Sequence, residues 1–207
     1  MTGITRENSR LNYRATVVDY LTKHNSPNDY HILKFGQVDA EYIYYYKTVI
    51  LKQIISADNF FRKIILDYVK FITGFGNRNI IVCGSNMCTP IPNWKDLIIG
   101  FIAKTEEEKG EAYRDLHNLT YENHNRHILL FNSILKEECE KNNIVYFDTT
   151  EECFDFEKFT LKEKYLGRCN HYRGGESDLR GVIDQNGDNL YGVETYITFL
   201  EKILQTL

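Results

Sequence analysis

The chain has 207 residues, 26% of them charged and 43% hydrophobic, and its formal net charge at pH 7 is -4. This length allows a single domain with a sizeable hydrophobic core. The slightly acidic balance provides no basic surface for a nucleic acid or an anionic membrane, and we expect neither as a partner. No apolar run is long enough to span a membrane, and the first residues lack the apolar core of a secretion signal, which predicts a soluble, cytoplasmic protein.

The cysteines predict neither a disulfide framework nor a metal site. They are odd in number and irregularly spaced, without the paired CxxC units of a zinc ribbon: Cys83, Cys88, Cys139, Cys153 and Cys169. Reduced thiols are therefore expected. The sequence has no signature for a metal or another cofactor, and we expect none.

The first predicted element is a short strand followed by a long helical region. Tyr30 to Phe35 ("YHILKF") is rich in apolar residues and ends at Gly36, which favours a buried strand over a helix of that length. From Ala40 to about Phe71 apolar residues recur at helical spacing. Capping residues cluster near Ser56 and predict an interruption there.

Two more strands follow, each separated by a helical crossover. The predicted elements are a second strand at Ile80 to Gly84, a helical stretch from about Thr105 to Lys141, a third strand at Asn143 to Thr150, and a closing amphipathic helix from Glu194 to Leu207. Apolar strands joined by long crossovers are typical of a parallel sheet covered by helices. The sequence thus predicts an α/β fold with a mainly parallel sheet, as one domain over residues 1–207.

In such sheets ligands bind beyond the carboxyl ends of the strands, because loops converge there and helix N-termini direct their positive ends inward. Three strand-end loops are expected at this edge: Gly36 to Asp39, Gly84 to Met87, and Asp148 to Thr150. The polar, glycine-rich region from Leu166 to Tyr191 could fold over the same edge as a loop. We therefore expect the binding site at the carboxyl edge.

The order of these features resembles the SGNH (GDSL-like) hydrolase superfamily, in particular its members associated with glycans and capsular polysaccharides. Gly3 resembles the glycine of the family's second block, and Gly36 with Asp39 resembles the two ends of its third block. "GDNLYG", Gly187 to Gly192, resembles the late catalytic loop. The resemblance implies a three-layer α/β/α, flavodoxin-like fold and an oxyanion held by a backbone amide and a side-chain amide.

The resemblance also assigns roles to individual positions. It implies that Asp188 is the catalytic aspartate, and that the binding residues are Gly3, Gly36, Gln37, Asp39, Asn86 and Asn189. Val38 stands where the family has its oxyanion asparagine, and the adjacent Gln37 offers a donor instead. Asn189 stands where a histidine base could lie. The family's nucleophile block, with its strand and helix, would lie upstream of Met1.

Two residues could replace the missing nucleophile and base. Ser85 lies at a predicted strand end, and His171 lies in the loop that could fold over the edge. Each has a simpler interpretation, since Ser85 also suits a polar turn and His171 a solvent-exposed loop.

The long helical stretch suggests a further histidine cluster. On an unbroken helix, His117, His124 and His127 would share a broad face, where two of them could hold a metal ion. Aromatic residues on the same face favour a partly buried stripe with satisfied histidines. The tyrosines at positions 42 and 44–46 resemble a carbohydrate-stacking surface, but neighbouring helical residues point in different directions, so some must pack inward.

Two functions fit these observations. The first is an SGNH-like carbohydrate esterase or acyl transferase, and the second is a catalytically inactive SGNH-like domain that binds a glycan or a protein partner. A nucleotide-binding sheet is disfavoured, because "GFGNRN", Gly74 to Asn79, precedes a strand instead of opening a helix. A sheet without its first strand would have an open edge, which a second copy of the chain could fill as a homo-oligomer.

Overall fold

The structure is a computed structural model of the whole chain, and it describes residues 1–5, 13–24, 26–76, 79–88, 93–163, 201 and 203–205. The chain divides into two compact units. The first comprises Met1–Ser85 and Lys95–Asp148, and the second comprises Asn86–Trp94 and Thr149–Leu207.

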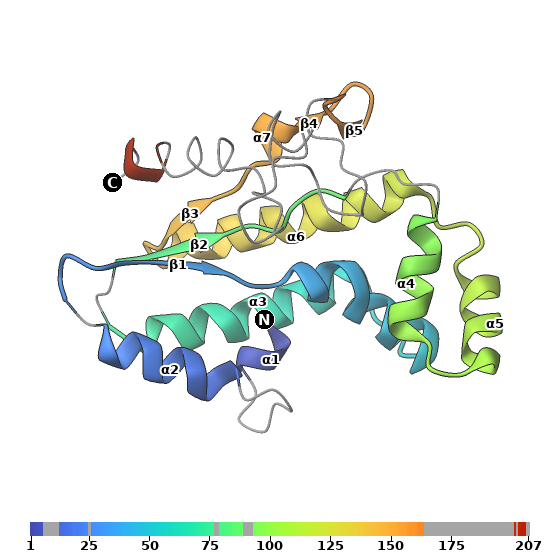
Figure 1. Cartoon of the computed structure of the whole chain (residues 1–207), viewed down its shortest axis with the longest axis horizontal. Helices are drawn as coiled ribbons and strands as arrows, with labels where there is room; N and C mark the ends of the chain where they lie inside the picture. Colours follow the sequence, from blue (N-terminus) through green and yellow to red (C-terminus); the bar gives the residue numbers. More distant parts are fainter. Residues whose placement is uncertain are drawn as a thin grey trace, which may run out of the picture. The chain divides into compact units, whose positions relative to one another are not determined.

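The first unit contains a three-stranded parallel sheet (Figure 1). Its strands are β1 (Tyr30–Lys34), β2 (Asn79–Cys83) and β3 (Val145–Phe147), in the spatial order β1-β2-β3. Ile32 of β1 lies opposite Ile81, and Ile81 in turn lies opposite Val145 of β3. Because each successive parallel strand needs a crossover, helices separate the strands in sequence. The α/β class and all three strands predicted for this region are confirmed.

Burial differs between the central strand and the edge strand. Ile80, Ile81 and Val82 of β2 are all buried, as their continuous apolar run predicts for a strand covered on both faces. β1 instead alternates between exposed and buried residues. Its Ile32 is exposed, so the prediction of a fully buried first strand is wrong for one of its faces. β1 lies at the end of the strand order and has only β2 as a neighbour among the described strands.

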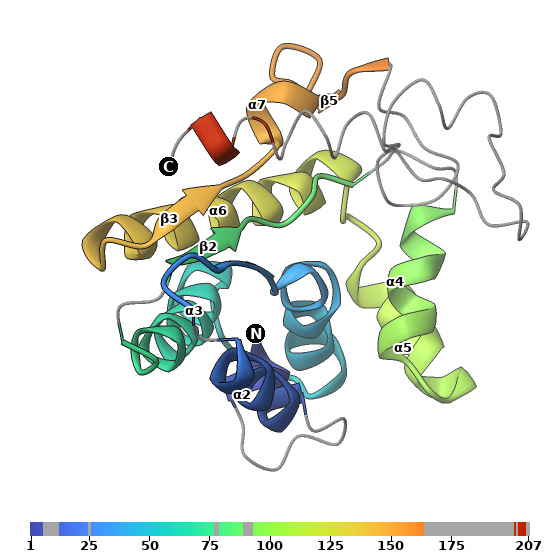
Figure 2. The ribbon, with the colours of Figure 1, turned by 60° about the vertical axis from the view of Figure 1, so that its left-hand side comes forward.

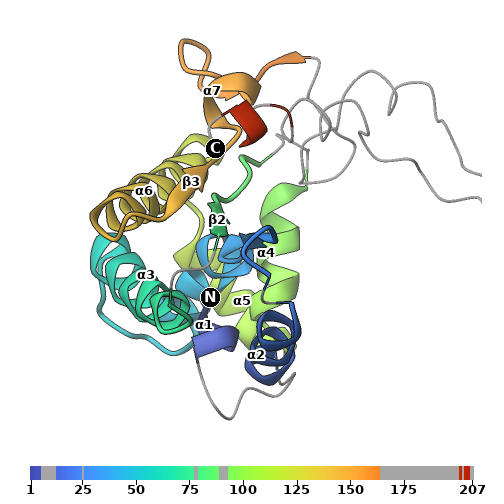
Figure 3. The ribbon, with the colours of Figure 1, turned by 90° about the vertical axis from the view of Figure 1, so that its left-hand side faces the viewer.

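Two long helices, α3 (Ala57–Thr73) and α6 (Tyr121–Lys141), pack against each other beside the sheet (Figures 2 and 3). Each begins at a hydroxyl residue that caps the first turn. The Ser56 and Thr120 side chains accept hydrogen bonds from the backbone N–H groups of Asn59 and Asn123, at 3.2 and 3.1 Å. Apolar faces then form the contact, where Phe61 meets Phe131 edge to face with ring centroids 5.5 Å apart.

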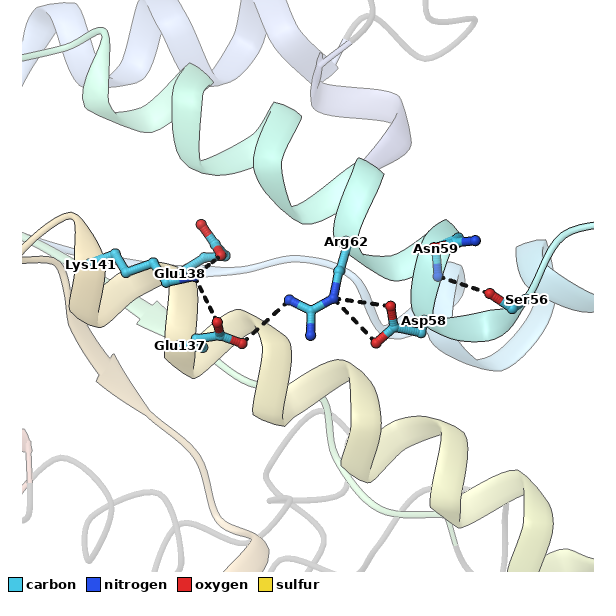
Figure 4. A network of polar contacts seen from close by, with 7 residues as sticks. All are labelled: Ser56, Asp58, Asn59, Arg62, Glu137, Glu138 and Lys141. Carbon is cyan, nitrogen blue, oxygen red and sulfur yellow. Dashed lines mark hydrogen bonds and ion pairs between the residues drawn. The ribbon is translucent and has the colours of Figure 1, made fainter.

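A chain of ion pairs runs along the outer side of this helix pair (Figure 4). Arg62 of α3 contacts Asp58 one turn earlier at 3.0 Å and Glu137 of α6 at 3.4 Å. Lys141 contacts both Glu137 and Glu138 at 2.7 Å. Most of these side chains are about half exposed, so water screens the pairs and the apolar contact dominates the packing energy.

The predicted helical regions differ from the structure in two ways. The segment after β1 is π-helical in η1 (Asp39–Ile43) and η2 (Tyr46–Ile50), not an ordinary α-helix. The predicted helix from Thr105 to Lys141 is two helices, α5 (Glu106–Asp115) and α6, separated by a turn that ends at Thr120. Cap-forming threonines at positions 105 and 120 mark both true starts, because each binds a free N–H group of its own helix.

Three helices that precede α5 in the chain were not predicted from the sequence. They are α1 (Thr2–Thr5), α2 (Tyr13–Lys23) and α4 (Trp94–Ile102). α4 and α5 lie side by side (Figure 1), where the Tyr113 hydroxyl donates a hydrogen bond of 2.8 Å to the Asp96 carboxylate. None of the helices in the described ranges is both long and apolar enough to cross a lipid bilayer.

The described part of the second unit contains α7 (Thr150–Cys153) and a small antiparallel pair, β4 (Phe154–Asp155) and β5 (Thr160–Leu161). The ring of Phe154 contacts those of Phe156 and Phe159, each at 5.2 Å between centroids. Residues 201 and 203–205 are helical. The rest of the helix predicted for Glu194 to Leu207, and the loop predicted for Leu166 to Tyr191, lie outside the described residues.

Candidate functional site at the carboxyl edge of the sheet

The turn after β1 depends on a glycine. Gly36 has φ +111°, a conformation that residues with a Cβ atom rarely adopt. Its carbonyl accepts the hydrogen bond of the Ala40 N–H group at 2.9 Å, which starts the following helical segment. A Cβ atom at Gly36 would also collide with the ring of Phe131 on α6. Gly36 therefore lets the backbone turn directly against that ring.

The polar side chains of this turn point to partners within the fold. The Gln37 amide donates a hydrogen bond to the buried carboxylate of Glu41, and the Asp39 carboxylate binds the backbone nitrogen of Met1 at 2.6 Å. Val38 is 47% exposed and occupies the surface of the loop. The donor expected of Gln37 is thus engaged with Glu41. Gly3 lies in α1, the helix that follows Met1.

The backbone after β2 is held by one side chain of α6. The Ser85 N–H group donates to the Oδ1 atom of Asn132, and the Nδ2 atom of Asn132 donates to the Ser85 carbonyl, both at 2.8 Å. Both residues are buried. Asn132 therefore satisfies the two backbone groups that β2 leaves open where it ends, much as a neighbouring strand would.

β3 contributes a phenol–carboxylate pair beside this loop. The Tyr146 hydroxyl donates to the Oδ2 atom of Asp148 at 2.6 Å. Burial raises the pKa of the Tyr146 hydroxyl, and the negative charge of Asp148 raises it further. A Cβ atom at Gly84 would lie 2.8 Å from Cβ of Asp148, so this glycine permits the close approach of the two strand ends.

The strand ends therefore converge on one turn of α6. Phe131 lies against Gly36 after β1, and the next residue, Asn132, binds Ser85 after β2. This arrangement brings Gly36, Ser85 and Asp148 to the same edge of the sheet. The three loops were predicted from the sequence, but the role of Asn132 was not, because its only signal was a polar residue among the apolar positions of α6.

The environment of Ser85 differs from that of an activated nucleophile. Ser85 is 2% exposed, and its hydroxyl has no hydrogen-bond partner among the residues that the structure describes. A serine nucleophile needs a base within hydrogen-bond reach. Of the other predicted residues, Asn86 belongs to the second unit. His171, Asp188 and Asn189 lie outside the described residues, so their predicted roles remain predictions.

A histidine–tyrosine cluster lies where the π-helical segment meets α6. The Tyr45 hydroxyl is 3.0 Å from Nδ1 of His124 and 3.0 Å from Nδ1 of His127. Tyr45 and His124 are almost fully buried. Tyr45 therefore faces inward, as the sequence predicted for part of the tyrosine run. His117 lies in the turn before α6, so its predicted place on one face with the other two histidines is wrong.

Burial favours the neutral form of both histidines of this cluster. Burial lowers the pKa of His124 to about 3, with a smaller contribution from His127, and burial also lowers the pKa of His127. One phenol has a single proton to donate, so one imidazole accepts from Tyr45 while the other donates its Nδ1 proton to the phenol oxygen. The two histidines must then be opposite tautomers.

Within the described ranges, no three histidine, cysteine or acidic side chains are grouped so that they could hold a metal ion. The four cysteines described, at positions 83, 88, 139 and 153, are free thiols. No protein-family model, curated protein or solved structure matches the chain.

Proposed function

We propose that this chain is an SGNH-like α/β domain that binds a glycan at the carboxyl edge of its parallel sheet, without hydrolysing it. The three-layer, flavodoxin-like arrangement of the family and the single domain are part of this proposal. Support comes from the parallel strands β1, β2 and β3, which follow one another in space as they do in sequence. Open parallel sheets bind their ligands at this edge.

The observation that carries the proposal is the double hydrogen bond between Asn132 and Ser85. It holds the end of the central strand rigidly, next to the carboxylate of Asp148. Asp148 and Gln37 are both partly exposed, so a carboxylate and an amide reach the surface of this edge, each oriented by a bond within the fold, from Tyr146 and to Glu41. Carboxylates and amides fixed by a rigid scaffold suit the hydroxyl groups of a sugar, which both donate and accept.

Burial of Ser85 favours binding over hydrolysis. A nucleophile must reach its substrate, and Ser85 is 2% exposed. Esterase or acyl transferase activity is the second candidate, supported by the Ser85 hydroxyl, which has no hydrogen-bond partner among the described residues.

Calorimetric titration with acetylated and deacetylated oligosaccharides tests the proposal. We expect binding by the wild-type chain, a loss of about tenfold in affinity for Asp148→Asn, and no change for the exposed Ser133→Ala on α6. A glycan array and titrations that show no binding would reject it. Turnover of a small aryl acetate that disappears in Ser85→Ala would favour the esterase instead.

A further inference from the structure

A cleft of about 720 Å³ lies in the first unit, along one face of α3. We call it the α3 cleft. One wall carries Phe60, Ile64, Asp67 and Phe71, which recur at helical spacing and span roughly 16 Å along the axis. The opposite walls come from α2 and from the segment that includes η2. Clefts of this volume are typical of small-molecule sites. None of its lining residues belongs to the site at the sheet edge.

The α3 cleft combines an apolar floor with positive charge. Phe71 and Phe75 contribute aromatic surface, the almost fully buried Phe60 also lines the cleft, and four cations line the same space: Arg14, Lys47, Lys63 and Lys70. Asp67 is the one carboxylate among the described lining residues. The chain as a whole has 29 acidic residues against 25 basic ones, so this excess of positive charge is local.

Several cations elsewhere on this unit are paired with carboxylates, whereas within the described ranges the three lysines of the cleft are not. Lys52, Arg62, Arg126 and Lys141 each pair with at least one carboxylate within 4.0 Å. In the part of the chain that the structure describes, Lys47, Lys63 and Lys70 have no such partner. Their positive charges are therefore available to an anion that enters the cleft.

Arg14 is the cation with the most defined position. Its Nη1 atom donates to the Thr5 carbonyl at 3.2 Å, and its guanidinium lies 5.0 Å from the centre of the Phe71 ring. An arginine held at two points loses less freedom when it binds, and its planar fork suits a carboxylate or a phosphate. Arg14 thus marks one end of the cleft for an anionic head group, and the phenylalanines line the path for an apolar body.

From this geometry we propose that the α3 cleft binds an anionic amphiphile, a molecule with a carboxylate or phosphate head and an elongated apolar body. Arg14 binds the head, and Lys63 and Lys70 add to the attraction. The apolar body lies against Phe60, Ile64 and Phe71. This site is separate from the glycan site and does not depend on it.

The test uses the full chain and three probes: a fluorescent polyene fatty acid, its uncharged alcohol, and an alkyl phosphate of the same chain length. Inorganic phosphate serves as a fourth ligand, without an apolar body. We expect the charged probes to bind more tightly than the alcohol. Arg14→Met keeps an apolar stem but removes the charge, and it should weaken binding of the charged probes by roughly three- to tenfold while leaving the alcohol unchanged. Whichever charged probe binds more tightly identifies the head group.

Two further variants separate the apolar part from the charge. Val18→Trp places a large ring in the cleft, so it should weaken the binding of all three probes. Lys136→Met removes an exposed lysine of α6 that does not line the cleft, and it should change nothing. Circular dichroism shows whether each variant folds. If Arg14→Met does not fold, Lys70→Glu takes its place in the test of charge.

Three outcomes would overturn the proposal. The fatty acid and the alcohol could bind equally well, or the charge variants could leave the preference for the acid unchanged. Inorganic phosphate could also bind as tightly as the alkyl phosphate, which would show that the apolar wall takes no part. The amphiphile experiments do not depend on the glycan experiments, because they use different probes and different variants. If no glycan binds at the sheet edge, the results for the α3 cleft can still be interpreted.

Discussion

Asn132 binds both backbone polar groups of Ser85, and through them α6 holds the end of the central strand. Each residue lies 47 positions from the other in the chain, and both are buried. This contact links the sheet, the long helix and the candidate glycan site. Most of the stability of the edge should depend on it and on the glycine turn next to it.

Replacing Asn132 by alanine should destabilise the fold by about 2–4 kcal/mol, because a buried N–H group and a buried carbonyl lose their partners together. Urea denaturation followed by circular dichroism measures the change. Ser133→Ala, at the next, exposed position of α6, is the matched control and should shift the unfolding free energy by less than about 0.5 kcal/mol. Equal effects of the two variants would show that the Asn132–Ser85 contact contributes little.

Gly36→Ala should also be strongly destabilising, by about 2 kcal/mol or more. The alanine would have to adopt the positive φ of Gly36, and its Cβ atom would collide with Phe131. Gly110 provides a contrast, since it lies within α5 and a Cβ atom there meets nothing within 4 Å. Gly110→Ala should stabilise the chain by roughly 0.5–1 kcal/mol. Thermal melts of both variants compare them directly, and a tolerated Gly36→Ala would contradict the role assigned to this turn.

Acid should destabilise the chain partly through the histidine–tyrosine cluster. The pKa of His124 falls from 6.5 to about 3 on folding, so the unfolded chain binds this proton more tightly. Its contribution to stability is complete above pH 6.5 and is lost progressively as the pH falls toward 3, by roughly 2 kcal/mol at pH 5 relative to pH 8. Unfolding free energies measured between pH 8 and pH 4.5 would show this slope.

The matched variants for that experiment are His124→Gln and His117→Gln. Glutamine at position 124 does not titrate, so the difference from the wild type should shrink as the pH falls. His117 is exposed and does not contact the cluster, so its variant should follow the wild-type curve. A His124→Gln chain with an unchanged pH slope would refute the assignment of the slope to this histidine.

Phe61 and Arg62 are adjacent on α3, so variants at these two positions compare the contribution of apolar packing to stability with that of ion pairing. Phe61 is fully buried against Phe131, and Phe61→Ala should cost about 3–5 kcal/mol because it leaves a cavity between α3 and α6. Arg62 makes the exposed pairs with Asp58 and Glu137 (Figure 4), and Arg62→Gln should barely move the urea midpoint. That small shift should vanish in high salt. A larger effect for Arg62 than for Phe61 would reverse the stated balance of forces.

Local sequence signals predicted the strands more reliably than the helices. Continuous apolar residues identified β2, because a central parallel strand is buried on both faces. Helix boundaries depended on caps: the cluster near Ser56 was used to predict an interruption, whereas the cap at Thr120 was overlooked and α5 and α6 were predicted as one helical stretch. The π-helical segment could not be predicted, because its hydrogen bonds differ from those of an α-helix while the spacing of its apolar residues is similar.

By itself the sequence determined the elements whose cause is local: apolar strands, a glycine at the turn of Gly36, and hydroxyl caps at Ser56 and Thr120. Only the tertiary structure decided which side chains meet. Asn132 reaches Ser85, Tyr45 reaches two histidines, and four cations line one cleft, because strand order and helix packing bring distant segments together. Such contacts depend on where elements pack in three dimensions, and the residue types alone do not encode the distances between them.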